Sequence, residues 1–209
     1  MIVAFDGLDG VGKTTIARKF ANDFTFKYIE RPLYEVFGIT NRNSPKYQAA
    51  CDLEERVYND TKSSELRACL TSLGLIYLHK IMNKENIVLD RSLLSNFSYN
   101  GDYQSLPLFK ALLEMNIYPD VAFLLYASDD IRRQRIVKRN PNDRDLTNPD
   151  VISQTYDKLF KFINEYNLPI ILINTDNKNE QEVYDEVRKV YENILKENKS
   201  CISKQKIKL

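Results

Sequence analysis

The sequence predicts an α/β protein built on a parallel β-sheet with helices on both faces. Two observations support this: the chain contains short runs of apolar residues, and these runs alternate with stretches that have helical spacing. The length of 209 residues and the hydrophobic fraction of 43% are ordinary for one globular domain. We therefore expect a single domain over residues 1–209, ending in a frayed, lysine-rich tail at residues 198–209.

Five runs are the predicted strands of this sheet. They are short, mostly apolar and bounded by turn residues or by charged residues, as expected of strands buried on both faces. Parallel strands bring their carboxyl ends to one edge of the sheet, and open α/β folds bind their ligands there. The predicted strands are residues 2–5, 26–29, 87–89, 121–126 and 169–174.

Helical patterns fill the stretches between these strands. The first helix follows the turn after residue 7, and Ser44 with Pro45 forms an N-cap and a first helical position for a helix that runs to about residue 58. A longer pattern covers about residues 64–82. Ser128 caps a helix with acidic residues in its first turn, Asn148 and Pro149 open another, and the closing helix has apolar residues at 183, 187, 190 and 194.

The composition excludes several classes of function. With 30 Lys and Arg against 29 Asp and Glu, the net charge of +1 gives no general attraction to nucleic acid or to an anionic membrane. No apolar run is long enough to cross a bilayer, and the chain begins in an apolar run, not in a basic leader. A single histidine and three unpaired-looking cysteines disfavour histidine-based hydrolysis, zinc binding and disulfides. We expect a cytoplasmic protein without nucleic-acid or membrane partners.

Residues 7–14 fit the phosphate-loop pattern G-x-x-x-x-G-K-[ST] and lie between a predicted strand and a predicted helix. Glycines let the backbone N–H groups point at phosphate oxygens, Lys13 bridges the β- and γ-phosphates, and Thr14 ligates Mg²⁺. The expected ligands are therefore ATP, as the phosphoryl donor, and Mg²⁺. The residues expected at the nucleotide are Gly7, Asp9, Gly10, Val11, Gly12, Lys13, Thr14 and Thr15.

A phosphate loop alone is compatible with a kinase, a GTPase or a mechanical ATPase. Residues 177–180, Asn-Lys-Asn-Glu, are similar to the guanine-reading Asn-Lys-x-Asp but end in Glu. No Asp-x-x-Gly occurs outside the phosphate loop to act as a γ-phosphate switch. We therefore disfavour a GTPase and interpret residues 177–180 as a polar loop that caps the final helix.

Asp90 and Arg91 directly follow the third predicted strand, so both should emerge at the same sheet edge as the phosphate loop. A carboxylate at this place can hold Mg²⁺, and the guanidinium can grip the phosphate of an acceptor. Five arginines follow between residues 131 and 144. Arg135 and Arg139 share one helical face and, with Arg144, suit a lid over about residues 135–147, whereas Arg132 and Arg133 also fit a solvated basic face.

The motifs together resemble those of thymidylate kinases. Residues 5–15 are similar to that family's phosphate loop, Asp90-Arg91 with residues 95–101 to its Asp-Arg segment, and residues 130–144 to its lid. The resemblance implies the phosphate-loop kinase fold, ATP-dependent phosphorylation of dTMP and a homodimer. Because Gly10 stands where the eukaryotic type has an arginine, it also implies that the catalytic arginines come from the lid, as in the bacterial type.

The resemblance also implies roles for individual side chains. The carboxylate of Asp9 would face the acceptor sugar or its metal, and Arg91 would hold the acceptor phosphate. Asn96 would meet the base, Tyr99 would disfavour ribose, and Asn100 belongs to the same segment. Arg67 is a candidate for the base-binding arginine.

Two departures from the family pattern keep alternatives open. Its Arg-Glu-Pro-Gly-Gly segment is replaced here by residues 30–34, Glu-Arg-Pro-Leu-Tyr, and its Phe-Ala-Ala-Asp-Arg segment has no clear match. Deoxynucleoside kinases place an acidic residue near this point as a general base on the 5′-hydroxyl, and Glu30 fits that role. The alternatives to a dTMP kinase are therefore a deoxynucleoside kinase that uses Glu30 and a nucleotide-binding regulatory protein without transfer activity.

Overall fold

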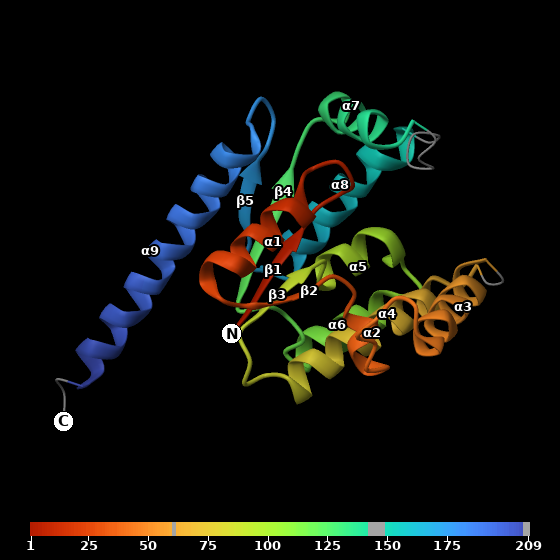
Figure 1. Cartoon of the computed structure of the whole chain (residues 1–209), viewed down its shortest axis with the longest axis horizontal. Coiled ribbons are helices and arrows are strands. Elements are labelled where there is room, and N and C mark those ends of the chain that lie inside the picture. Colours follow the sequence, from red (N-terminus) through yellow and green to blue (C-terminus); the bar gives the residue numbers. More distant parts are fainter. Residues whose placement is uncertain (60–61, 142–148, 207–209) are drawn as a thin grey trace.

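A five-stranded parallel sheet forms the centre of the molecule (Figure 1). The structure is a computed structural model that describes residues 1–59, 62–141 and 149–206. The strand order is β2-β3-β1-β4-β5, and helices cover both faces, which confirms the predicted fold class. The strands are β1 (Ile2–Asp6), β2 (Lys27–Ile29), β3 (Ile87–Asp90), β4 (Val121–Tyr126) and β5 (Ile171–Asn174).

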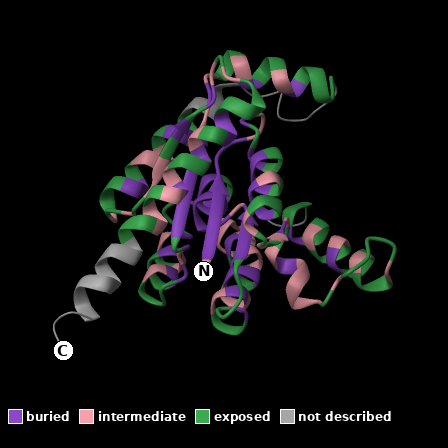
Figure 2. Cartoon of the chain, turned by 60° about the vertical axis from the view of Figure 1, so that its left-hand side comes forward, coloured by how far each residue is buried: buried purple, intermediate pink, exposed green. Residues whose placement is uncertain are grey.

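The register of the central strands aligns their carboxyl ends. Phe5 of β1 pairs with Asp90 of β3, and Asp6 of β1 pairs with Leu124 of β4. Every residue of β1 and β3 is buried, which explains why these strands read as nearly continuous apolar runs (Figure 2). The segments that follow β1, β3 and β4 therefore start side by side.

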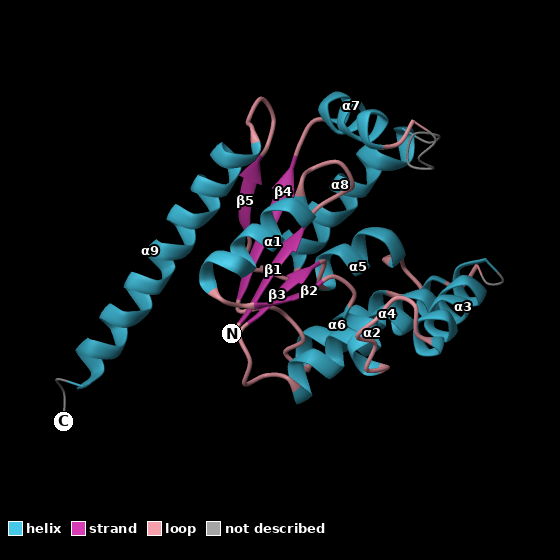
Figure 3. Cartoon of the chain, in the orientation of Figure 1, coloured by secondary structure: helices cyan, strands magenta, loops and turns pink. Residues whose placement is uncertain are grey.

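The nine helices named here surround this sheet, and six of them were predicted. The short helices α2, α5 and α6 were not, because each spans fewer than ten residues and gives little periodic signal. The last helix, α9, continues to Lys206, so the tail predicted to fray from residue 198 is helical over most of its length (Figure 3). The helices are α1 (Lys13–Phe24), α2 (Pro32–Val36), α3 (Pro45–Asn59), α4 (Ser64–Ile81), α5 (Leu93–Asn100), α6 (Leu106–Glu114), α7 (Asp129–Arg139), α8 (Pro149–Glu165) and α9 (Glu180–Lys206).

Two hydrophobic cores hold these layers together. On one face of the sheet, side chains of α1 and α9 pack on the strands, with the rings of Phe20 and Tyr191 4.7 Å apart. On the other face α4, α5, α6 and α8 pack together, and Phe97 stacks on Phe162 at 3.8 Å. Among the described residues, no helix is long and apolar enough to cross a membrane. Residues that directly follow the strands belong to these cores: Val11 of the phosphate loop to the first, and Leu93 at the start of α5 to the second.

Gly74 allows α4 to approach α2 closely. A methyl group at this position would lie 2.3 Å from the backbone nitrogen of Leu33 and 2.4 Å from the carbonyl carbon of Pro32. We predict that Gly74→Ala lowers the free energy of unfolding by about 1–3 kcal/mol, measured by urea denaturation, because backbone atoms cannot move aside easily. Alanine normally stabilises a helix by up to about 1 kcal/mol over glycine, so an unchanged or raised stability would contradict this packing. Cys69→Ala, at an exposed position of the same helix, is the matched control.

Candidate active site

The phosphate loop joins β1 to α1 and adopts the conformation that its glycines permit. Gly7, Gly10 and Gly12 have φ values of 135°, 88° and 92°, in the region that other residues rarely occupy. The helix α1 begins at Lys13, so its free N–H groups face the loop. This arrangement is suited to binding phosphate oxygens.

Lys13 is buried inside this loop, with only 4% of its surface exposed. Its ammonium donates a hydrogen bond to the carbonyl oxygen of Leu8 at 2.8 Å and lies 3.5 Å from Oδ1 of Asp9. The pKa of Lys13 is lowered to about 8: burial is the largest cause, the positive charge of Arg91 acts in the same direction, and the carboxylates of Asp9 and Asp90 oppose the shift. The charge of this ammonium is therefore sensitive to its neighbours.

Asp90, at the end of β3, faces the start of α1. Its Oδ2 accepts hydrogen bonds from the hydroxyls of Thr14, at 2.5 Å, and Tyr28, at 3.0 Å. Among the described residues, none donates a hydrogen bond to its buried Oδ1. A hydroxyl beside a carboxylate with an unoccupied oxygen fits Mg²⁺, which typically uses one or two carboxylates together with phosphates and water.

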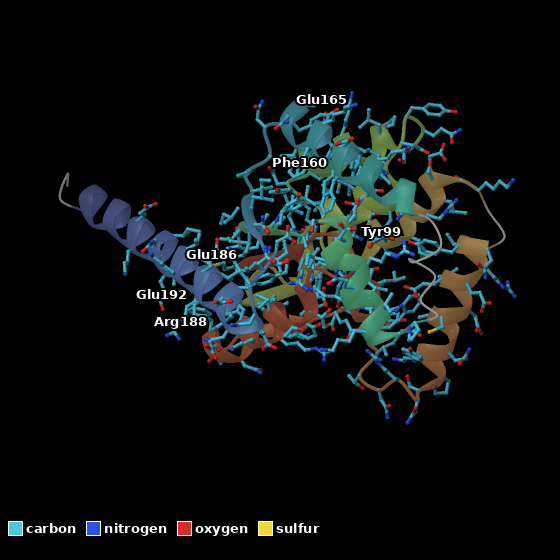
Figure 4. The ribbon with its side chains drawn as sticks, turned by 90° about the horizontal axis from the view of Figure 1, so that it is seen from above. Tyr99, Phe160, Glu165, Glu186, Arg188 and Glu192 are labelled. Carbon is cyan, nitrogen blue, oxygen red and sulfur yellow. The ribbon has the colours of Figure 1, made fainter. Side chains whose placement is uncertain are left out.

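Arg91 lies at a strained turn directly after β3. Its φ is 91°, and its backbone nitrogen donates to the carbonyl oxygen of Phe5 at 3.1 Å. The guanidinium donates to Oδ1 of Asp9 at 2.5 Å and to the hydroxyl of Tyr99 at 3.1 Å. Asp9 thus contacts both Lys13 and Arg91 with the same carboxylate oxygen. Tyr99 is half exposed and lies on the side of the molecule away from α9 (Figure 4).

Asp6 anchors this turn from below. It is completely buried at the end of β1. Its carboxylate accepts four hydrogen bonds, from the backbone nitrogens and hydroxyls of Ser92 and Ser95, at distances from 2.5 to 3.0 Å. These bonds satisfy N–H groups at the start of α5, as an N-cap does. Asp6 therefore fixes the position of Arg91 relative to the phosphate loop.

Asn96 and Asn100 lie between α5 and α4. The amide of Asn96 donates to the carbonyl oxygen of Ala68 at 3.1 Å and to the hydroxyl of Ser72 at 3.0 Å, and its Oδ1 accepts from Asn100 at 2.9 Å. Both side chains are buried, at 3% and 6% exposure. Their hydrogen bonds join two helices in this structure, and their contact with a substrate base stays a prediction.

Two further predicted site residues are Arg67, on α4, and Glu30, directly after β2. The guanidinium of Arg67 lies 6.0 Å from the ring of Tyr58, and its buried Nε has no hydrogen-bond partner among the described residues. Such an orphaned donor is a free contact for a polar ligand. The carboxylate of Glu30 accepts hydrogen bonds from Arg18 at 3.2 Å and Arg42 at 3.0 Å, so two guanidinium groups share it.

The helix α7 brings Arg135, one of the predicted lid arginines, to the phosphate loop. Arg135 donates to the hydroxyl and the carbonyl oxygen of Thr175, at 3.0 and 2.7 Å, and to the carbonyl oxygen of Gly10 at 3.4 Å. Arg139 is exposed at the end of this helix, while Arg144 and the rest of residues 142–147 of the predicted lid lie outside the described residues. Arg135 borders a cavity of about 180 Å³ that is also lined by Gly12, Thr15, Thr175, Lys178 and Asn179.

The sequence of the chain is similar to those of known proteins. A family model described as thymidylate kinase matches residues 70–187, which is more than half of the chain. The chain belongs to the thymidylate kinase family. A probable thymidylate kinase of Methanocaldococcus jannaschii is 25% identical over 196 residues, covering 93% of this chain and 97% of the relative. A thymidylate kinase of Mycoplasma mobile is 26% identical over 226 aligned positions, covering 98% and 100%.

Solved structures share the fold at low identity. The thymidylate kinase of Candida albicans has a TM-score of 0.61 at 15% identity and covers 92% of this chain and 91% of its own. A deoxyadenosine kinase of M. mycoides with bound dCTP has a TM-score of 0.58 at 17% identity and covers 92% and 100%. Thymidylate kinases and deoxynucleoside kinases therefore have this architecture in common.

Three side chains at the site of this thymidylate kinase family member escaped the sequence analysis. Tyr28 contacts Asp90 and Arg132 contacts Asp9, whereas Asp6 anchors Ser92 and Ser95 beside Arg91. Asp6 could have been identified from the sequence, since it ends a buried strand directly before the phosphate loop. Arg132 was interpreted in part as surface charge, but it is 2% exposed and donates to the carbonyl oxygen of Asp9 at 2.8 Å.

The interpretation of residues 177–180 as a helix cap is confirmed. Oδ1 of Asn179 accepts a hydrogen bond from the backbone nitrogen of Glu182 at 3.0 Å. In return, Oε2 of Glu182 accepts from the backbone nitrogen of Asn179 at 2.7 Å. This reciprocal pair is a capping box at the start of α9.

The depressed pKa of Lys13 predicts a pH-dependent affinity for ATP. The ammonium is charged below about pH 8 and loses its proton above it, so phosphate binding should weaken as the pH rises through this value. We expect the affinity, measured by calorimetry from about pH 7.5 to about pH 9.5, to fall by up to about tenfold per pH unit. Lys13→Arg, which stays charged over this range, should show a flat profile. A wild-type affinity that does not change with pH would contradict this role for Lys13.

Proposed function

We propose that this protein transfers the γ-phosphoryl group of ATP to dTMP and forms dTDP. The observation that carries the proposal is the shared carboxylate of Asp9, which places Lys13 and Arg91 within 3.5 Å of one oxygen atom. Lys13 is the phosphate-loop cation for a donor, and Arg91 is a second cation outside that loop. Two cations that meet at one carboxylate oxygen suit two phosphate groups that must meet.

The donor is proposed to be ATP, held by the phosphate loop. Its phosphates would accept hydrogen bonds from the loop N–H groups and from Lys13. Its base would lie toward the cavity of about 180 Å³ beside Arg135. Arg139 and Arg144 are proposed to approach the triphosphate from the lid, where they would neutralise charge on the group in transfer.

Mg²⁺ is proposed to accompany the donor. The hydroxyl of Thr14 and the carboxylate of Asp90 would hold it, since Oδ1 of Asp90 has no donor among the described residues. When bound, Mg²⁺ neutralises charge on the β- and γ-phosphates. Tyr28 keeps the other carboxylate oxygen in place through its hydrogen bond.

The acceptor is proposed to lie between Arg91, Tyr99 and the α4–α5 region. Its phosphate would replace the carboxylate of Asp9 as a partner of Arg91, and its sugar would pass Tyr99. Arg67, with its unpartnered Nε, is proposed to contact the base, and we retain Asn96 and Asn100 as candidates that would have to exchange their present helix–helix contacts.

The transfer itself needs positioning and charge neutralisation. An oxygen of the dTMP phosphate forms a bond to the γ-phosphorus while the bond to the bridging oxygen of ADP breaks. The acceptor oxygen is already ionised near neutral pH, so no general base is required. Lys13, Arg91 and the lid arginines are the residues proposed to stabilise the charge that moves.

A deoxynucleoside kinase is the alternative, and the contacts of Glu30 argue against it. A general base must be free to approach the 5′-hydroxyl, whereas Oε2 of Glu30 is already engaged by hydrogen bonds from Arg18 and Arg42. A non-catalytic regulatory protein would need neither an acceptor arginine nor lid arginines.

Glu30→Gln tests the choice of acceptor. With dTMP as the acceptor, we expect kcat to fall by less than about tenfold, because only a peripheral electrostatic contact is lost. A general base would give a loss of about 10² to 10⁴. Transfer from ATP to dTMP and to thymidine is measured by chromatography of the products, with Glu54→Gln as a control that breaks a similar pair with Arg31. A large loss with thymidine, together with no transfer to dTMP in the wild type, would overturn the proposal.

We further propose that the protein is a homodimer that uses α4. Leu66, Leu73 and Ile81 are 48%, 46% and 65% exposed, and their spacing of seven and eight residues places them on one face of this helix. An apolar stripe of this kind is suited to pack against a second copy. The double variant Leu66→Lys/Leu73→Lys should sediment as a monomer, while Met115→Lys, directly after α6, should not change the mass. A monomeric wild type would contradict the proposal.

A further inference from the structure

Arg132 is a buried charge beside the phosphate loop. It lies in the first turn of α7 and is 2% exposed. Its Nε donates to the carbonyl oxygen of Asp9 at 2.8 Å, and its Nη1 donates to Oδ1 of Asp129 at 3.0 Å. The guanidinium carbon lies 5.8 Å from the centre of the Tyr156 ring.

Burying a guanidinium is costly unless its hydrogen-bond donors are satisfied. A carboxylate and a backbone carbonyl satisfy two of the donors of Arg132, and the ring of Tyr156 provides a cation–π contact. The partners come from three segments: the phosphate loop, α7 and α8. The geometry therefore ties α7 to the phosphate loop at a defined distance.

The surroundings of Gly10 show how close this approach is. A Cβ atom at Gly10 would lie 2.8 Å from the carbonyl oxygen of Arg132 and 3.1 Å from Cγ1 of Ile136. Arg135 donates to the carbonyl oxygen of Gly10 at 3.4 Å. Two arginines one turn apart on α7 thus hold two consecutive carbonyl groups of the phosphate loop.

Asp9 is the residue whose position depends on this contact. Its carbonyl group is held by Arg132, and its carboxylate pairs with Arg91 and Lys13. If the peptide after Asp9 rotated, the carboxylate would move relative to both cations. By fixing the carbonyl group of Asp9, Arg132 therefore restricts the position of the carboxylate that Lys13 and Arg91 share.

We propose that Arg132 is a positioning residue for phosphoryl transfer, which holds the backbone of Asp9 so that one carboxylate keeps Lys13 and Arg91 together. The kinetic part of this inference rests on the proposed function. The effect of Arg132 on the ATP site does not, because it can be measured without an acceptor.

The test compares Arg132→Met and Arg132→Lys with Arg133→Met. Arg133 is the exposed neighbour of Arg132 on the same helix, so its substitution removes a charge without touching Asp9. We expect Arg132→Met to raise the acceptor KM at least about tenfold, and Arg132→Lys, which keeps one donor, to restore part of that loss. Arg133→Met should match the wild type.

A readout of ATP binding separates positioning from mere folding. Because Arg132 holds the carbonyl group of Asp9 in the phosphate loop, Arg132→Met should also weaken the binding of ATP, measured by calorimetry at one fixed pH without an acceptor, by about tenfold relative to Arg133→Met. This result is independent of whether dTMP is the acceptor. If wild-type enzyme phosphorylates no monophosphate but the affinity for ATP still falls in Arg132→Met, the proposed function fails and the role of Arg132 stands.

Two outcomes would overturn the inference. One is a folded Arg132→Met whose acceptor KM and affinity for ATP both equal those of Arg133→Met, even if its melting temperature is lower. The other concerns the case in which Arg132→Met does not fold, where Arg132→Lys decides. The inference expects an intermediate acceptor KM in Arg132→Lys, and a wild-type acceptor KM would assign Arg132 to stability alone.

Discussion

The buried carboxylate of Asp6 is the interaction on which the rest of the site depends. It joins the end of β1 to the start of α5 through four hydrogen bonds from Ser92 and Ser95. The turn between β3 and α5 contains Arg91 in a conformation, φ 91°, that a residue with a side chain adopts only when its surroundings hold it there. Without this anchor, Arg91 would have no defined direction relative to the phosphate loop.

The carboxylate of Asp9 balances the charges of Lys13 and Arg91. Two cations this close to one another repel, and the pKa of Lys13 reflects both its burial and that repulsion. Phosphate groups carry more negative charge than one carboxylate and offer more acceptor atoms. In the proposed reaction, the phosphate groups of a donor and an acceptor would therefore displace Asp9 from its two partners.

The sequence predicted the parts of the site that depend on neighbours in the chain. The phosphate loop, Asp90 and Arg91 follow buried strands directly, so local pattern and strand order were enough to bring them to one edge. The contacts of Arg132 were not predictable in this way, because its partner Asp9 lies 123 residues earlier. Asn96 shows the same limit, since its burial depends on the packing of α5, a short helix, on α4.

The central claim is that the Arg91 side of the site receives a phosphate group. Calorimetric titration with dTMP and with thymidine tests it most directly, because the two ligands differ only in that group. A charge-assisted contact is worth about 1.5–3 kcal/mol, so dTMP should bind at least about tenfold more tightly than thymidine to the wild type. In Arg91→Ala this difference should disappear while the affinity for thymidine stays the same. Equal binding of both ligands to the wild type, or an undiminished preference for dTMP in Arg91→Ala, would contradict the account.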